Sequence, residues 1–214
     1  MKPNIAIVAN IDDDHLGHYQ DSQDCIKQSF IDFLKGTPED ALIIWCAEDA
    51  VLADLTRGIK RTQINYGFSS GAMIRAADYR VSGSGCTFNL MAPDFGIHEP
   101  VSFSLRAPGH YQVLNALAVI ACGLFYAIKP QLLQSFFSGY VGVFRRFNVY
   151  DNIYFNDRPC TMVDDYGHHP NEIQSVLEAI KDAWPQRRLW VVFQPHRYSR
   201  TAQLFDAFVE VLGC

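Results

Sequence analysis

The pattern of apolar and polar residues alternates between short apolar runs and amphipathic helical segments. Residues 5–9 and 41–46 are continuous apolar runs, typical of strands buried on both faces of a parallel sheet. Helices are predicted after each run, over residues 26–35 with Gly36 as the stop, and over residues 50–55. Another strand is predicted over residues 63–68. This alternation predicts an α/β fold.

The pattern changes between residues 74 and 105. Alternating residues with Gly83 and Gly85 predict a meander of antiparallel strands there. Residues 111–127 are apolar on most sides, which predicts a deeply buried helix, and a short helix is predicted over residues 131–137. The first part of the chain is therefore predicted to be a parallel sheet extended by a meander.

Residues 139–147 are predicted to be a hinge, because Gly139 and Gly142 precede the pair Arg145–Arg146. The predicted domains are residues 1–141 and 142–214. The second is expected to contain strands at 149–155, 160–163 and 189–193, and helices at 170–184 and 201–212. Five apolar side chains of the helix at 201–212 are expected to point into the core: Leu204, Phe205, Phe208, Val209 and Leu212. So small a sheet buries too little surface to be stable alone, and we therefore interpret the chain as a fragment of a longer protein.

Composition narrows the possible partners. Hydrophobic residues make up 49% of the 214 residues and the net charge is −5, with no dominant basic cluster. We therefore expect neither nucleic acid nor a membrane surface as a partner. The longest uncharged apolar run, residues 116–128, is too short to cross a bilayer. The six cysteines form no C-x-x-C pair, which favours reduced thiols and a cytoplasmic location.

Three polar segments each follow a predicted strand and precede a predicted helix: residues 10–15, 164–170 and 194–201. The carboxyl ends of parallel strands form the ligand crevice of α/β sheets, so these segments are the candidate sites. The first contains three aspartates and His15, which suit Mg²⁺ or Mn²⁺ unless they form only a solvated acidic turn.

The second and third segments each allow more than one interpretation. Asp164 and Asp165 with His168 and His169 are a candidate metal site, an acid–base pair or a polar turn. The third segment places His196 beside two guanidinium groups, which suit a carboxylate or a phosphate unless they form only a basic surface loop. No G-x-x-x-x-G-K-[ST] phosphate loop occurs in the chain.

Five stretches, in this order, resemble the Mur ligase family: Asn10–His15, Pro108–Gly109 with Val113–Ala118, Gly142–Phe147, Asp164–Pro170 and Gln194–Thr201. The last two resemble the alanine-adding branch. The resemblance implies the later part of a central ATPase-like domain followed by part of a Rossmann-like C-terminal domain. It also implies that the UDP-binding N-terminal domain of the same polypeptide and the phosphate loop are missing, so the chain alone is expected to be inactive.

The resemblance implies an ATP-dependent amide ligase of peptidoglycan synthesis that adds L-alanine to UDP-N-acetylmuramate through an acyl phosphate. It implies ATP and Mg²⁺ as cofactors, with His15 as a metal ligand. The implied nucleotide-binding residues are Gln112, Asn115, Arg146 and Asp165. The implied catalytic residues are His168, Arg197 and Arg200. The implied substrate-binding residues are Tyr166, His196, Arg197 and Arg200.

The chain departs from the family pattern at Tyr111–Gln112, where His-Asn is usual, and after His15, where Met-Asp is common. Two alternatives from other classes stay open. One is a non-catalytic binding module on the same fold. The other is a metal-dependent hydrolase that uses the first two polar segments.

Overall fold

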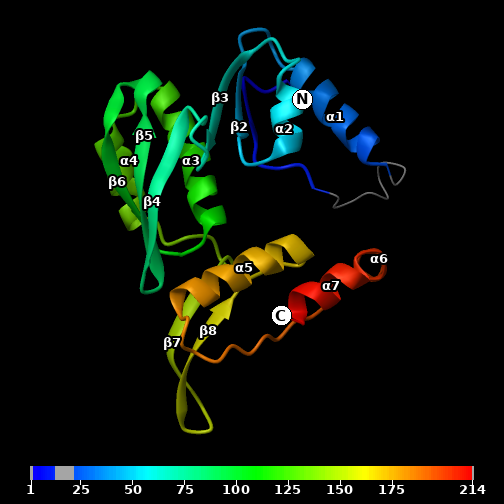
Figure 1. Ribbon diagram of the computed structural model, residues 1–214, viewed down its shortest axis with the longest axis vertical. Helices are drawn as coiled ribbons and strands as arrows, with labels where there is room; N and C mark the ends of the chain where they lie inside the picture. Colours follow the sequence, from blue (N-terminus) through cyan, green and yellow to red (C-terminus); the bar gives the residue numbers. More distant parts are fainter. Residues whose placement is uncertain (1, 13–21, 214) are drawn as a thin grey trace. The chain divides into compact units, whose positions relative to one another are not determined.

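The computed structural model describes residues 2–12 and 22–213 (Figure 1). The predicted metal ligand His15, with Asp13 and Asp14, lies outside these residues. The chain divides into two compact units. The first comprises Met1–Tyr79, Phe88–Phe103 and Val113–Phe137; the second comprises Arg80–Thr87, Ser104–Gln112 and Ser138–Cys214.

A six-stranded sheet follows chain order from β1 to β6. Its strands are β1 (Ile5–Val8), β2 (Leu42–Cys46), β3 (Thr62–Gly67), β4 (Ile74–Ser82), β5 (Gly85–Ala92) and β6 (Ile97–Leu105). The first three pair in parallel, with Ile5 opposite Leu42 and Leu42 opposite Thr62. Strand β4 pairs in parallel with β3 only at Ile74 and Arg75. Two residues join β4 to β5, so these strands run in opposite directions, as predicted for the meander.

Four α-helices accompany this sheet: α1 (Gln23–Lys35), α2 (Ala50–Thr56), α3 (His110–Phe125) and α4 (Pro130–Gly139). Helix α2 is capped by Asp49, whose side chain accepts the N–H of Leu52 at 3.0 Å. The 3₁₀ turn η2 (Pro93–Phe95) lies between β5 and β6. No helix among the described residues is both long enough and apolar enough to span a bilayer.

The core of the first unit lies between its strands and helices. Side chains of β2 are almost wholly buried, as are Leu117 and Ile120 of α3. The ring of Phe103 in β6 stacks on Phe88 of β5 with centroids 5.5 Å apart and meets Phe137 of α4 edge-on at 6.1 Å. The burial of Leu117 and Ile120 confirms the buried helix predicted from the sequence, which is α3.

The second unit contains an antiparallel hairpin and three helices (Figure 1). These elements are β7 (Asn148–Phe155), β8 (Arg158–Asp164), α5 (Pro170–Ala183), α6 (Tyr198–Gln203) and α7 (Phe205–Leu212). A small core joins α5 to α7 through Ile173, Phe208 and Val211, with Leu177, Phe193 and Leu204 partly buried against it.

Two predictions for the second unit are wrong. Residues 189–193, all described, form no strand, because no neighbouring strand pairs with them; Trp190 is 76% exposed and Val192 99%. The predicted helix over 201–212 is two helices that meet at Leu204. Of its five predicted inward side chains, Phe205, Val209 and Leu212 are exposed, since α7 instead turns Phe208 and Val211 inward.

Candidate functional site

The loop after β8 is joined by hydrogen bonds to the turn before β7. One oxygen of Asp165 accepts the N–H of Phe147 at 2.8 Å, and the other accepts the N–H of Gly167 at 2.6 Å. The N–H of Tyr166 donates to the carbonyl oxygen of Arg145 at 2.8 Å. Two segments that lie well apart in the sequence are therefore held side by side.

Arg146 lies in an unusual backbone turn. Its neighbours Arg145 and Phe147 have φ of 56° and 52°, a left-handed conformation that residues other than glycine seldom adopt. The buried ring of Phe147 lies parallel to the ring of Trp184, with centroids 6.5 Å apart. This ring contact and the bond to Asp165 hold the turn in place.

The guanidinium group of Arg146 lies between two carboxylates. Its Nη1 is 3.4 Å from Oε1 of Glu172 and 3.9 Å from Oδ1 of Asp165. The other oxygen of Glu172 accepts the N–H groups of His168 at 2.9 Å and His169 at 3.2 Å. Glu172 thus stabilises the start of α5 and contacts Arg146 with the same carboxylate.

The pKa values of the two carboxyl groups shift in opposite directions. Burial raises the pKa of Asp165, and bonds from Gly167 and Phe147 with the charge of Arg146 only partly oppose that rise. Burial also raises the pKa of Glu172, but the N–H groups of His168 and His169 outweigh it, so that pKa lies below its ordinary value.

Aromatic rings continue the site toward the loop before α6. The ring of His168 lies edge-on to Tyr166, with centroids 5.3 Å apart, and its centroid is 6.3 Å from that of His196. The guanidinium of Arg145 lies over the Tyr166 ring at 5.1 Å. Tyr166, His168 and His196 are therefore brought together, although two of the segments involved do not follow parallel strands as predicted.

Arg197 and Arg200 differ in their surroundings. Arg197 is exposed and has φ of 72° at the start of α6. Arg200 is only 7% exposed, and its Nη1 donates to the carbonyl oxygen of His196 at 3.2 Å. Arg200 thus supports the loop that carries His196, whereas the Arg197 side chain is open to solvent.

Gln112 and Asn115 lie three residues apart near the start of α3, so they share one face of that helix. Nε2 of Gln112 donates to the hydroxyl of Tyr111 at 3.3 Å, and Asn115 is exposed. Two adjacent departures from the family pattern are therefore bonded to each other.

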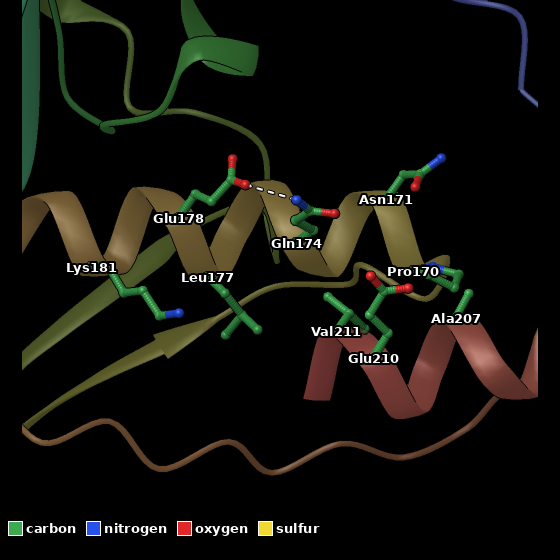
Figure 2. A pocket seen from close by; sticks show the side chains of 9 residues that line it. All are labelled: Pro170, Asn171, Gln174, Leu177, Glu178, Lys181, Ala207, Glu210 and Val211. Carbon is green, nitrogen blue, oxygen red and sulfur yellow. Dashed lines mark hydrogen bonds between the residues drawn. The ribbon is translucent and has the colours of Figure 1, made fainter. Parts of the chain in front are cut away.

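Across residues 2–12 and 22–213, no three His, Cys, Asp or Glu side chains are grouped to hold a metal ion. A groove of about 270 Å³ lies between α5 and α7, floored by Leu177 and Val211 and rimmed by polar side chains that include Gln174 and Lys181 (Figure 2). None of the predicted site residues that the structure describes lines this groove.

Sequence reasoning missed Glu172, although a signal for it exists. A glutamate at the third helical position commonly folds back onto the N–H groups that open the helix, and Pro170 marks that opening. It also missed Glu48 and Asp49, which follow β2 and accept N–H groups from the segments after the neighbouring strands β3 and β1. Asp49 stands directly before the predicted helix at 50–55, which is the ordinary place for a capping aspartate.

Two stretches of the chain match domains of a class of modular α/β enzymes. Residues 1–123 match the Mur ligase middle domain, and residues 145–213 match the family described as Mur ligase, glutamate ligase domain. The chain belongs to the Mur ligase family.

Solved structures share its fold. UDP-N-acetylmuramate-alanine ligase MurC from Thermotoga maritima has a TM-score of 0.74 at 23% identity, over 98% of this chain and 50% of that one. MurF from Acinetobacter baumannii has a TM-score of 0.71 at 20% identity, over 85% and 38%. MurF from Thermotoga maritima, solved in complex with ADP, has a TM-score of 0.70 at 19% identity, over 85% and 40%. The chain thus spans half or less of the length of these relatives.

Proposed function

We propose that this chain supplies nucleotide-binding and amino-acid-binding parts of an ATP-dependent amide ligase that adds L-alanine to UDP-N-acetylmuramate. The observation that carries the proposal is the convergence of Arg146, Asp165 and His168 on one loop cluster, with His196 beside it. We further propose residues 1–141 and 142–214 as its domains, and a cytoplasmic location.

The proposed nucleotide contacts fit the chemistry of the groups present. The side chain of Arg146 is 43% exposed, and its guanidinium group suits a phosphate. Each oxygen of Asp165 accepts one N–H and keeps a lone pair that can accept a ribose hydroxyl. Gln112 and Asn115 on one face of α3 would contact adenine. Mg²⁺ would be held with the help of His15.

The proposed amino-acid contacts come from the loop before α6. Arg197 presents an exposed guanidinium fork that would pair with the carboxylate of L-alanine and leave its amine free to attack. Arg200 would keep His196 and that loop in position through its bond to the His196 carbonyl oxygen. Tyr166 and His168 would line the same substrate site.

ATP would supply the phosphoryl group that activates the muramyl carboxylate. The residues of this chain would contribute positioning and neutralisation of negative charge, which are the main requirements of such a transfer. The amine of L-alanine would then attack the activated carbonyl carbon, and phosphate would leave.

Calorimetric titration of the chain with ADP tests the nucleotide assignment. Arg146→Met and Asp165→Asn should each weaken ADP binding about tenfold or more, because each removes a charged hydrogen-bonding partner. Arg57→Met is the matched control, since Arg57 is 78% exposed and pairs with Asp54 three residues earlier on the same helix end. Equal ADP affinity in all four proteins would contradict the assignment.

Phosphate release with ATP, UDP-N-acetylmuramate and L-alanine tests the proposed inactivity of this chain. We expect none above background, since the chain carries no phosphate loop to hold the β and γ phosphates. Turnover that depends on L-alanine would show instead that these residues suffice for the ligase reaction.

A further inference from the structure

We infer that Glu172 is a positioning residue. Its carboxylate holds both the guanidinium of Arg146, the proposed nucleotide contact, and the backbone of His168 and His169. The inference rests on the proposed function only for the ligand that Arg146 binds. Its structural basis is the set of contacts that the Glu172 carboxylate makes. No motif of the resemblance includes Glu172, since the matching stretch ends at Pro170.

The two oxygens of Glu172 have separate tasks. Oε1 lies 3.4 Å from Nη1 of Arg146, and Oε2 accepts the N–H groups of His168 and His169 at 2.9 and 3.2 Å. The same Oε2 is 3.7 Å from Nδ1 of His168. One side chain on α5 therefore fixes the backbone at the start of that helix and the cation on the facing turn.

Arg146 needs such a partner because its own turn does not determine where its side chain lies. The turn is fixed at Phe147, through the bond to Asp165 and the Trp184 ring, while the Arg146 side chain remains 43% exposed. Asp165 is the more distant of the two carboxylates, at 3.9 Å against 3.4 Å. Glu172 is thus the closer anchor of the charged group.

The same contacts place a carboxylate at the start of α5. The N–H groups of His168 and His169, just before the first helical residue Pro170, both donate to Glu172, so an anion approaching this helix end also meets negative charge. A phosphate near this loop would therefore be recognised by the Arg146 side chain. The position of that side chain consequently matters more than the helix dipole.

Two substitutions separate the two tasks. In Glu172→Gln, the amide oxygen can still accept the two backbone N–H groups, but the amide NH₂ then faces Arg146 and cannot accept from it. In Glu172→Ala, both tasks are lost. Glu178→Gln is the matched control, because Glu178 lies on the same helix and accepts a bond from the Gln174 side chain at 2.9 Å (Figure 2).

The first readout needs no nucleotide. In the Nε–Hε NMR spectrum of the chain, Glu172→Gln should shift and broaden the Arg146 resonance, whereas Glu178→Gln should leave it unchanged. Hydrogen exchange at the His168 and His169 amides should stay within about threefold in Glu172→Gln and accelerate by about tenfold or more in Glu172→Ala. An unmoved Arg146 resonance in Glu172→Gln would overturn the inference.

The second readout is ADP affinity. Glu172→Gln should raise the Kd for ADP roughly three- to tenfold, a moderate effect because both partners are partly exposed. In an Arg146→Met background the same substitution should change the Kd less than about twofold, because the two residues act through one contact. An equal loss in both backgrounds would overturn the Arg146 route.

The two proposals fail differently. If the unmodified chain does not bind ADP, the proposed nucleotide site is wrong, and the NMR and exchange readouts still decide whether Glu172 positions Arg146. If ADP binds and Arg146→Met weakens it while Glu172→Gln does not, the nucleotide site stands and the role of Glu172 is wrong.

Discussion

Two pairs of acidic residues, one in each unit, hold loops together by the same means. In the first unit, Oε1 of Glu48 accepts the N–H of Phe68 at 2.8 Å and the N–H and hydroxyl of Ser69 at 2.9 and 2.8 Å. Its neighbour Asp49 accepts the N–H of Ile11 at 2.7 Å. In the second unit, Asp165 likewise accepts an N–H from another segment, that of Phe147, whereas Glu172 accepts N–H groups at the start of its own helix.

The two acidic pairs differ in the groups that surround their carboxylates. The hydrogen bonds that reach Glu48 and Asp49 within the described residues come from N–H and hydroxyl groups alone. At Asp165 and Glu172, the partly exposed guanidinium of Arg146 lies within 4 Å of both carboxylates. A carboxylate bonded only to N–H and hydroxyl groups stabilises loops, whereas we expect a carboxylate that also anchors an exposed cation to help build a binding site. We therefore expect a structural role for the first pair and propose a binding role for the second.

The largest expected effect is on the stability of the second unit. Asp165→Ala leaves the N–H groups of Phe147 and Gly167 without their acceptor, at about 1–3 kcal/mol each, and relief of the buried charge offsets part of this. We expect the free energy of unfolding of that unit to fall by about 2–3 kcal/mol, measured by hydrogen exchange of its peptides in urea.

Asp164→Ala is the control for that experiment. The side chain of Asp164 is 33% exposed, and its carboxylate lies 3.5 Å from Nε of Arg145. Loss of such a pair should cost less than about 1 kcal/mol. Equal losses of stability in the two variants would mean that the hydrogen bonds of Asp165 do not hold the second unit together as the comparison states.

A smaller effect is expected in the first unit from Asp49→Ala. This change removes the cap of α2 at Leu52 and the bond to Ile11, and should lower the free energy of unfolding by about 1–2 kcal/mol. Urea unfolding followed by exchange of first-unit peptides measures it. Asp54→Ala, on the same helix but 71% exposed, should change that free energy by less than about 0.5 kcal/mol. A loss at Asp54 as large as at Asp49 would mean that charge, not capping, is responsible.

The sequence predicted the first unit more closely than the second for a physical reason. Each strand of the first unit pairs with a strand nearby in the chain, so its apolar run indicates the fold directly. The run at 189–193 has the same composition, but a strand also needs a partner, and composition does not reveal whether one is present. The break at Leu204 was missed because residues 201–212 satisfy the helical period when Phe205 and Val209 are assumed to face inward.

The sequence indicated the candidate site in part. Arg146, Asp165, His168 and His196 stand in short segments rich in imidazole, guanidinium and carboxylate groups, and the resemblance to the Mur ligase family gave them and Tyr166 their expected roles. The bond between Asp165 and the Phe147 N–H could not be predicted, since it joins segments 18 residues apart through a left-handed turn that no sequence signal marks. The sequence could not predict that Arg197 is exposed and Arg200 buried either. The two residues have the same side chain and lie three positions apart, so only the packing around each distinguishes them.

The smallest expected effect is that the contributions of Glu48 and Asp165 to stability change in opposite directions with pH. The pKa of Glu48 is lowered: burial raises it, but the bonds from Ser69 and Phe68 outweigh that rise. Its contribution to stability is therefore present above its ordinary value of 4.5 and is lost as pH falls through the lower folded value. The pKa of Asp165 is raised by burial, so its contribution is greatest below its ordinary value of 3.8 and is lost as pH rises through the higher folded value.

Glu48→Gln and Asp165→Asn convert this difference into a measurement. As pH falls from about 6 to about 3, the stability advantage of the unmodified chain over Glu48→Gln should shrink, and its advantage over Asp165→Asn should grow. Each change should be below about 1 kcal/mol, because solvent screens Glu48 and because hydrogen bonds offset the burial of Asp165. Hydrogen exchange at several pH values, corrected for the intrinsic rate, reads both units in one chain. Slopes of the same sign would mean that burial at Asp165 does not outweigh its bonds, and the two acidic pairs would then differ only in the cation beside the second.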